Sequence, residues 1–470
     1  MTQPAPALPY ADPTAADPLA ERRAVAKVLA RVIPLMILLY LFNYLDRQNL
    51  MFAKKAMQAD LGWFDEAAYG LGAGLFFVGY FVFEVPSNLI MERVGARLWM
   101  ARIMVTWGLI STCMMFVREP WHLYALRLLL GIAEAGFFPG MILYLTYWVP
   151  TEHRSRAAAW FLTSTALSGA VGGPVSDLLL NLSGFGMHGW QWLFVIEGVP
   201  SVLLGLLILV VLCDRPAQAR WLTDAEKAAL EARLSAERAS MPASHHGLRA
   251  GLADPRVLVL CLLYGALIFG FYVVNYWTAD LVRHVLPADT RLPIGTLSAI
   301  PFAAAIVTMS AVGPWADRTG RLRGTIVVMA LVAAGGYVLA ANARGPYLMI
   351  AALAVAAAAN WSTLGPFWAL PSRFLTGTAA AAGIGVINAV GNLLGGFLGP
   401  NMMGQLKKGR PADGLEIGLW ATAGVLVAAA GIAGAMGRLM RKQTPTDGRS
   451  VTTLPVVPAV PVASPVATRQ

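Results

Sequence analysis

Long apolar segments recur along the whole chain, and the polar stretches between them are mostly short. Twelve segments are long enough to cross a bilayer, which takes about 20 residues of helix. They cover residues 32–53, 69–91, 98–117, 122–149, 158–182, 192–212, 256–282, 293–314, 324–343, 347–371, 379–403 and 416–437. Helices satisfy their own backbone hydrogen bonds in lipid, whereas a barrel would need short alternating segments. The pattern therefore predicts an all-α membrane protein with twelve transmembrane helices.

One long polar stretch, residues 214–255, separates the sixth segment from the seventh. It is charged and favours helix ("TDAEKAALEARLSAERA"), and it divides the chain into a six-helix half at 32–213 and another at 256–438. The two ends, 1–31 and 439–470, are rich in Ala and Pro or in Pro, Val and Thr. We expect both ends to be disordered tails.

A weak internal repeat supports this division. "MERVGAR" follows the second segment and "ADRTGRLR" follows the eighth, so that aligning Glu92 with Asp317 also pairs Gly95 with Gly320. "GAVGGP" (169–174) and "GGFLGP" (395–400) stand at nearly the same spacing. Two markers at one spacing predict two pseudo-symmetric halves, an arrangement typical of secondary transporters with a substrate site between the halves.

Composition and charge agree with a membrane protein and orient it. The chain is 57% hydrophobic and only 13% charged, against about 25% charged residues in soluble domains. Most of its Lys and Arg residues lie in the tails, the central loop and the loops on the same side, which predicts that both termini are cytoplasmic. The net charge of +10 therefore needs no nucleic-acid partner. The cysteines and histidines show no metal-ligand spacing, and we expect no metal and no cofactor.

Charged residues inside the first half are the strongest functional signal. A charge at mid-bilayer costs about 2.5–3.5 kcal/mol, so a group of them indicates use. Asp46 and Arg47 are adjacent and point about 100° apart on a helix, while Arg127 and Glu134 share a face about 10 Å apart along the axis. A buried guanidinium suits a carboxylate ligand, and a buried carboxyl suits a proton carrier. We therefore assign Arg47 and Arg127 to substrate binding and Asp46 and Glu134 to protonation.

The alternative for these four residues is a salt-bridge network that only holds the first and fourth segments together. Glu84, near the end of the second segment, is better explained as a tether for a gate. The second half offers dipoles instead of charges, with "FYVVNYW" (271–277) and the pair Asn388 and Asn392. Asn392 shares a helical stripe with glycines at 395, 396 and 399, which lets another helix approach closely.

The repeated acidic-basic-Gly loop resembles the signature of the major facilitator superfamily. Within it, "YLDRQN" (44–49), "GYFVFEVPSNLIMERVGAR" (79–97), "RLLLGIAEAGFFPGMILYLTYWVP" (127–150) and "GTAAAAGIGVINAVGNLLGGFLGP" (377–400) resemble the anion:cation symporter family. Members of that type include bacterial permeases for tartrate, phthalate, hydroxyphenylacetate and sugar acids. Glu92 stands where the superfamily usually has Asp, and Asp177 stands where the family more often has a small residue.

The resemblance implies the major facilitator fold in a bacterial inner membrane. It implies similar roles for the four charged residues, with Tyr44, Tyr80 and Asn392 lining the cavity. The two charged loops would latch the cytoplasmic side when the protein faces outward, through Glu92, Arg93, Arg97, Asp317, Arg318 and Arg321.

Together these features predict a proton-coupled importer of a small organic carboxylate, such as a hydroxy-dicarboxylate, a sugar acid or an aromatic acid. It would work by alternating access as a monomer, with the anion, protons and membrane lipid as its partners. The alternatives are an organic anion/phosphate exchanger, which would favour an Arg from each half, and a sensor with a transporter fold. No nucleophile–base pair or phosphate loop supports an enzyme.

Overall fold

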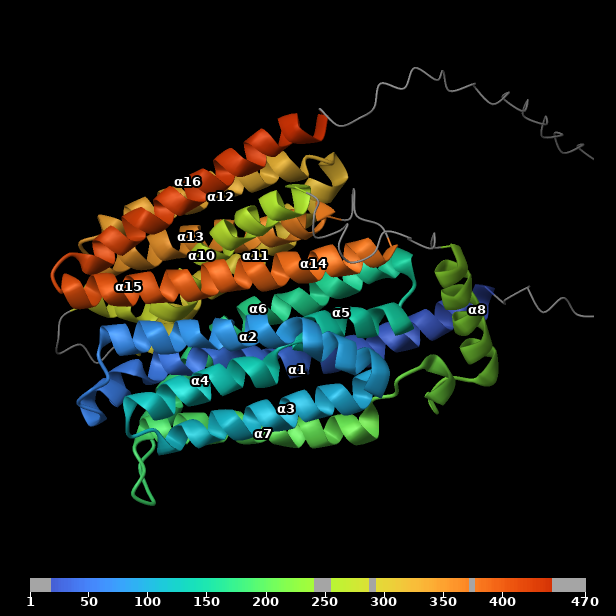
Figure 1. Ribbon diagram of the computed structural model, residues 1–470, viewed down its shortest axis with the longest axis horizontal. Coiled ribbons are helices and arrows are strands. Elements are labelled where there is room, and N and C mark those ends of the chain that lie inside the picture. The colour runs from blue at the N-terminus through green and yellow to red at the C-terminus, as the bar shows by residue number, and fades with distance from the viewer. Residues whose placement is uncertain (1–17, 241–254, 287–292, 372–376, 442–470) are drawn as a thin grey trace, which may run out of the picture.

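The computed structural model describes residues 18–240, 255–286, 293–371 and 377–441 (Figure 1). Within these ranges, eleven helical stretches are long and apolar enough to cross a membrane. The remaining predicted span, 158–182, falls on α6 (Thr151–Leu180), a helix of 30 residues that packs between α1 and α11. The prediction of twelve spans in two sets of six is confirmed.

The first half contains the helices α1 (Pro18–Asp60), α2 (Glu66–Val94), α3 (Ala96–Cys113), α4 (Pro120–Glu134), α5 (Phe137–Trp148), α6 and α7 (Gly189–Val211). The second half contains α10 (Pro255–His284), α11 (Ile294–Thr319), α12 (Leu322–Ala341), α13 (Pro346–Trp368), α14 (Gly377–Asn392), α15 (Leu398–Gly409) and α16 (Gly414–Arg441). The helix-prone part of the central stretch forms α8 (Asp224–Ser240), which lies across one end of the bundle (Figure 1).

The two halves meet along two helix pairs, α2 against α15 and α6 against α11. Small residues let these helices approach. A Cβ added to Gly173 of α6 would lie 2.0 Å from the carbonyl oxygen of Gly295, and one added to Gly70 of α2 would lie 2.8 Å from that of Pro400. α2 and α15 hold the second and eleventh predicted spans, and α6 and α11 hold the fifth and eighth. The internal repeat relates the second span to the eighth and the fifth to the eleventh, so the two pairs are equivalent under the predicted pseudo-symmetry.

The repeat is also visible in the backbone of the two charged loops. Gly95 and Gly320, which the sequence alignment pairs, both have positive φ, at 97° and 66°. Each lies at the junction of two consecutive helices, α2–α3 and α11–α12.

Two predicted spans are interrupted next to candidate site residues. The span 122–149 is two helices, because α4 ends at Glu134 and Gly136 adopts φ +86°. A Cβ at Gly136 would lie 2.3 Å from Ser87 Oγ, so the chain turns here against α2. The span 379–403 contains a π-helical turn, η4 (Leu393–Phe397), directly after Asn392. Such turns commonly occur at functional sites because they redirect side chains.

The expected N-terminal tail is shorter than predicted. Residues 18–31 are helical, because α1 begins at Pro18. Ala20, Ala24 and Val28 form a buried stripe at helical spacing, and Lys27 donates to Glu226 of α8 at 2.8 Å. The composition of 1–31 hid this stripe, whose partner helix comes from the central stretch. Residues 1–17 and 442–470 lie outside the described residues, and α16 continues to Arg441.

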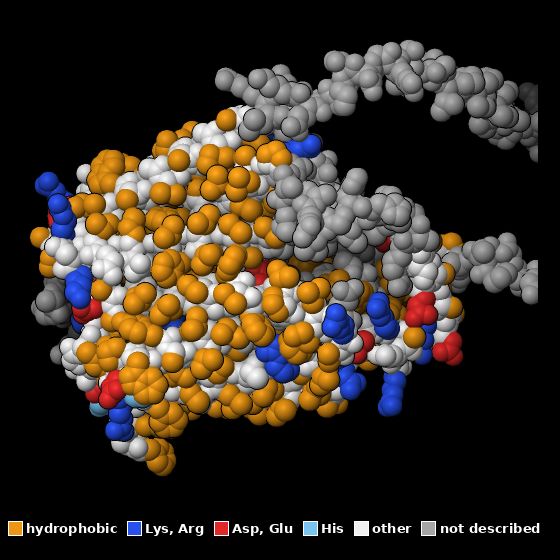
Figure 2. Space-filling view, viewed as in Figure 1, with side chains coloured by type: hydrophobic (Ala, Val, Ile, Leu, Met, Phe, Trp, Pro, Cys, Tyr) orange, Lys and Arg blue, Asp and Glu red, His pale blue; other side chains and the backbone are white. Residues whose placement is uncertain are grey.

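The surface agrees with a membrane-spanning bundle. Hydrophobic side chains cover the middle of the visible face, and the charged side chains gather mainly toward its two ends (Figure 2).

Candidate functional site

A small cavity lies between the two halves, in the middle of the bundle. Four of the predicted site residues line it, namely Tyr44, Arg47, Tyr80 and Asn392. The other lining residues are mainly aromatic or apolar: Tyr40, Phe138, Thr165, Tyr264, Ile268, Phe271, Tyr272, Leu364, Trp368 and Asn388. Arg47 is the one charged residue among them, so a ligand in this cavity would meet a single cation within an aromatic wall.

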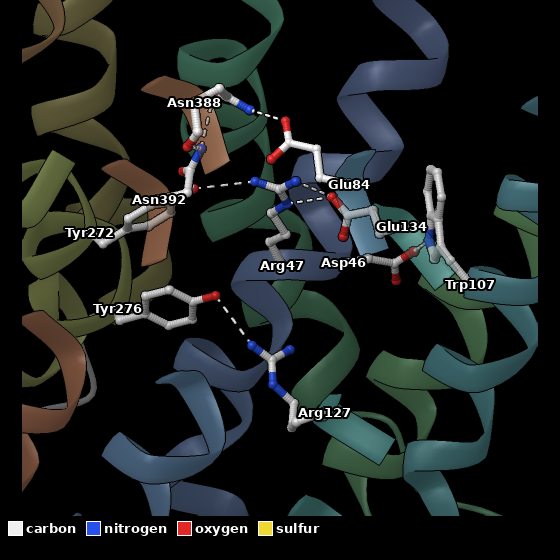
Figure 3. Close-up of polar contacts among 10 residues, drawn as sticks. All are labelled: Asp46, Arg47, Glu84, Trp107, Arg127, Glu134, Tyr272, Tyr276, Asn388 and Asn392. Carbon is white, nitrogen blue, oxygen red and sulfur yellow. Dashed lines mark hydrogen bonds and ion pairs between the residues drawn. The ribbon is translucent and has the colours of Figure 1, made fainter. Parts of the chain in front are cut away.

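Arg47 is held in that wall by partners from both halves (Figure 3). Its Nε donates to Glu134 Oε1 at 2.5 Å, and its Nη1 donates to the hydroxyl of Tyr272 on α10 at 3.2 Å. The guanidinium carbon lies 4.9 Å from the ring centroid of Tyr44 and 5.4 Å from that of Tyr80. Rings at this distance stabilise a cation through their faces. An ion pair between the first and fourth spans therefore exists, but it borders open space rather than a closed core.

Arg127 is as deeply buried, with 1% of its surface exposed, but it does not line the cavity. Its Nε donates to the carbonyl of Gly72 at 3.0 Å and its Nη2 to the hydroxyl of Tyr276 at 3.2 Å. No carboxylate forms an ion pair with it among the described residues. The ring of Phe76 lies between the two arginines, with each guanidinium carbon 5.1 Å from its centroid. The structure thus holds two buried cations at the same aromatic ring, and only Arg47 of the two has a carboxylate partner among the described residues.

Asp46 points away from the cavity, into the interior of the first half (Figure 3). It accepts hydrogen bonds from the indole of Trp107, from Ser111 Oγ at 2.8 Å and from Ser201 Oγ at 3.0 Å. Asn49 Nδ2 also donates to Asp46 Oδ1, at 3.3 Å. The divergence of Asp46 and Arg47 follows the helical geometry, and it places the two side chains in different environments.

The second half contributes amides and hydroxyls, as predicted from its sequence. Tyr272 donates to Asn392 Oδ1 at 3.1 Å, and Asn392 Nδ2 donates to Asn388 Oδ1 at 3.0 Å. Asn388 Nδ2 in turn donates to Glu84 Oε1 of α2 at 2.5 Å. Glu84 therefore forms a contact between the halves, and the role of tethering a gate stays a prediction.

The predicted gate residues lie at the end of the bundle that carries α8. Arg93, Arg97, Arg318 and Arg321 are exposed, and the backbone N–H of Arg97 donates to Asp214 Oδ1 at 2.8 Å. The side chains of Glu92 and Asp317 lie outside the described part of the structure.

Sequence reasoning missed the polar contacts at the opposite end. Lys54, 1% exposed, forms ion pairs with Glu66 of α2 and Asp280 of α10, and its Nζ lies 4.0 Å from the ring centroid of Trp277. Asp177 of α6 accepts hydrogen bonds from the backbone N–H groups of Gly295 and Thr296 at 2.9 and 2.8 Å, which caps α11. The departure of Asp177 from the family pattern was the available signal. Lys54 was hidden because it follows the end of an apolar segment and looks like a loop charge.

Within the described residues, no group of three or more His, Cys, Asp or Glu side chains is arranged to hold a metal ion.

Comparisons with known proteins place this geometry in a family. The model for the Major Facilitator Superfamily matches residues 36–400. A protein of Agrobacterium vitis named "Putative tartrate transporter" is 42% identical over 87% of this chain and 90% of its own length. A "Quinolone resistance transporter" of Acinetobacter baumannii is 41% identical over 84% of this chain and 91% of its own length.

Solved structures share the fold. A bacterial homologue of the human lysosomal transporter Spinster, in an inward-facing and occupied conformation, superposes with a TM-score of 0.69 at 19% identity, over 87% of this chain and 97% of that one. The xylose transporter XylE from E. coli, in a partially occluded inward-open conformation, gives 0.66 at 14% identity, over 90% and 100%. The relative named a tartrate transporter is consistent with the resemblance to anion:cation symporters. The chain belongs to the Major Facilitator Superfamily, and it is a multi-pass membrane transporter rather than an enzyme.

Proposed function

We propose that this transporter imports a small organic carboxylate together with protons, by alternating access, across a bacterial inner membrane with both termini in the cytoplasm. The observation that carries the proposal is the Arg47–Glu134 ion pair beside the cavity between the halves. The relatives that are named tartrate transporters support a carboxylate substrate.

The ion pair supplies a charge argument for coupling. Arg47 already has one carboxylate partner, Glu134, so a substrate carboxylate that binds Arg47 competes with it. A second negative charge without a cation is unfavourable in a buried site. If Glu134 takes up a proton as the substrate binds, the local net charge stays the same. One carboxylate and one proton then enter together.

Arg127 supports an anionic substrate in a different way. It is a buried cation whose hydrogen-bond partners are neutral, a carbonyl and the hydroxyl of Tyr276. Because Tyr276 belongs to the second half, separation of the halves would free the guanidinium for a carboxylate. Asp46, within the first half, is proposed as a further protonation site that responds to movement of α1 against α3 and α7.

Alternating access would use the polar contacts at the two ends of the bundle. The Lys54 cluster and the Asp177 cap hold the halves together at the end opposite α8, which the proposed orientation places outside the cell. The charged loops with Arg93, Arg97, Arg318 and Arg321, on the cytoplasmic side, would come together when that closure opens.

The experiment is uptake into proteoliposomes that contain the purified full-length chain. Labelled tartrate, gluconate and benzoate would be tested with and without an inward proton gradient. Glu134→Gln should still exchange labelled for unlabelled substrate but should not accumulate it, whereas Glu416→Gln, at an exposed carboxyl in the first turn of α16, should accumulate it normally. Normal accumulation by Glu134→Gln would remove Glu134 from the coupling role.

The alternative of an organic anion/phosphate exchanger is tested in the same vesicles. It predicts uptake only when anion is present inside, with no response to the proton gradient. Among the described residues, Arg47 of the first half is the one charged residue that lines the cavity. This does not favour the exchanger, because that mechanism would favour an Arg from each half.

A further inference from the structure

Glu84 is a buried carboxyl group that the proposed transport cycle does not use. It is fully buried on α2, and no cationic side chain forms an ion pair with it among the described residues. Its Oε1 accepts from Asn388 Nδ2, and its Oε2 has no hydrogen-bond partner. A buried oxygen without a partner is costly, and it indicates a site that is complete only with an additional atom.

The surroundings of Glu84 point to a proton as that atom. Among the described residues, the ionisable groups that interact with it are Tyr80 on its own helix, Tyr264 of α10 and Arg47 of α1. Arg47 is the one cation among them, and it is already paired with Glu134. An ionised carboxylate without a cation of its own is unfavourable inside a membrane protein. A bound proton removes the charge and turns one oxygen into a donor.

Glu84 ends a chain of hydrogen bonds that runs around the cavity wall (Figure 3). The chain consists of Glu134, Arg47, Tyr272, Asn392, Asn388 and Glu84. Beyond Arg47, every donor points the same way, toward Glu84. The chain of hydrogen bonds crosses from the first half to the second at Tyr272 and returns to the first half at Glu84.

A proton on Glu84 would reverse part of this chain. The carboxyl O–H would donate to Asn388 Oδ1 after rotation of that amide, and Asn388 Nδ2 would then donate to Asn392 Oδ1. Asn392 would give up its bond to the carbonyl of Asn388, now 2.9 Å, and would turn its NH₂ group toward the cavity. The hydroxyl of Tyr264, 3.5 Å from Asn388 Oδ1, can accept as well as donate and so fits either orientation.

The reversal changes what the cavity offers to a ligand. In the present orientation Asn392 presents an acceptor, Oδ1, to Tyr272. A substrate carboxylate has acceptors only, so it needs a donor there. Building on the proposed function, we propose that Glu84 binds a second proton and, through Asn388 and Asn392, makes the cavity wall a donor to the substrate carboxylate. Glu84 does not line the cavity and is a positioning residue.

The proposal is tested by the pH dependence of binding to the full-length protein in detergent, with labelled tartrate, gluconate and benzoate as probes. Each proton taken up with the substrate lowers the Kd by up to about tenfold per pH unit of acidification. Asp46 does not line the cavity, and its proposed protonation follows helix movement rather than binding. With protons taken up on binding at Glu134 and Glu84, the Kd of the wild type should therefore fall by about a hundredfold per pH unit. Glu84→Gln should bind the probes tightly, because Gln keeps an N–H donor. Its Kd should change by only about tenfold per pH unit, because the Gln side chain does not titrate. Glu416→Gln, at an exposed carboxyl in the first turn of α16, is the control and should keep the wild-type slope.

Two further readouts keep the test independent of folding and of the probe. Asn388→Ala leaves Glu84 in place and should reduce the slope in the same way, while weakening binding. The infrared band of a protonated carboxyl, recorded in membranes during acidification, should include a component that Glu84→Gln lacks.

The outcomes separate this proposal from the proposed function. An unchanged slope in Glu84→Gln, or no infrared component assigned to Glu84, overturns the proposal. A mere tether would let Glu84→Gln behave as wild type, whereas Glu84→Ala and Asn388→Ala would lose thermal stability without a change of slope. If Glu134→Gln keeps the full slope while Glu84→Gln reduces it, the role of Glu134 fails and that of Glu84 stands.

Discussion

The cap that Asp177 forms on α11 gives a prediction about how the outer side opens. Its carboxylate accepts three hydrogen bonds from the other half, two from backbone N–H groups and one from Thr296 Oγ1 at 3.1 Å. Substitution of a capping carboxylate by alanine costs about 0.5–2 kcal/mol. Asp177 is only partly buried, so we take a value of about 1.4 kcal/mol, which corresponds to about tenfold in an equilibrium constant. Asp177→Ala should therefore raise the outward-open population about tenfold, and the Lys54 cluster limits the effect.

The assay is the labelling of a cavity cysteine from outside the cell. Thr165→Cys on α6 lines the cavity, and the native Cys113, Cys213 and Cys261 would be replaced by serine. The rate of reaction with a membrane-impermeant maleimide then reports how often the outer side opens. The matched control is Asn181→Ala. The native Asn181 Nδ2 donates to the backbone carbonyl of Asp177 at the end of α6, at 2.7 Å, and not to the other half. Equal labelling rates in Asp177→Ala and in its parent would show that the cap does not hold the halves together.

Three further predictions concern binding and stability. Arg127→Ala should weaken carboxylate binding by about ten- to 150-fold, since a charged hydrogen bond is worth roughly 1.5–3 kcal/mol, and Arg127→Lys should lose less. Unchanged affinity in a binding assay would leave Arg127 with a structural role. Gly136→Ala places a residue with a Cβ at φ +86°, and that Cβ would clash with Ser87. It should lower the free energy of unfolding by about 1–3 kcal/mol and so lower the unfolding temperature. Gly313→Ala, where the added Cβ meets open space, should not. The hydrogen bond from Lys27, followed by that from the backbone of Thr223, lowers the pKa of Glu226 below its ordinary value of about 4.3. Docking of α8 on α1 is therefore stabilised above that value and loses this contribution as the pH falls below it, so limited proteolysis of α8 should increase in acid, and Glu226→Gln should remove the pH dependence.

Several features of the site followed from helical geometry alone. The seven-residue spacing of Arg127 and Glu134 predicts two side chains that cannot neutralise each other, and the structure gives them separate partners. The angle between Asp46 and Arg47 predicts different environments, and the two side chains face different elements. Spacing does not say which of the two faces the cavity, because that depends on the neighbours of α1.

The features that were missed depend on contacts between segments far apart in the chain. Asp177 meets α11, Lys54 meets α10, and the stripe from Ala20 to Val28 lies under α8. Asp177 departs from the family pattern, but its own segment does not indicate a partner on α11. Lys54 looks like a loop charge, and the stripe looks like part of a tail. The turn at Gly136 was also hidden, because a glycine within an apolar run is compatible with a continuous helix.

The sequence by itself determined the membrane class, the twelve spans, the division into halves and the cluster of charges in the first half. It did so because lipid imposes length, composition and backbone pairing on each segment separately. Only the tertiary structure decided that Arg47 faces the cavity while Asp46 does not, that Tyr272 and Tyr276 each meet an arginine, and that Glu84 ends a chain of hydrogen bonds. These outcomes depend on which helix faces approach each other, and that is a property of the packed bundle rather than of any single helix.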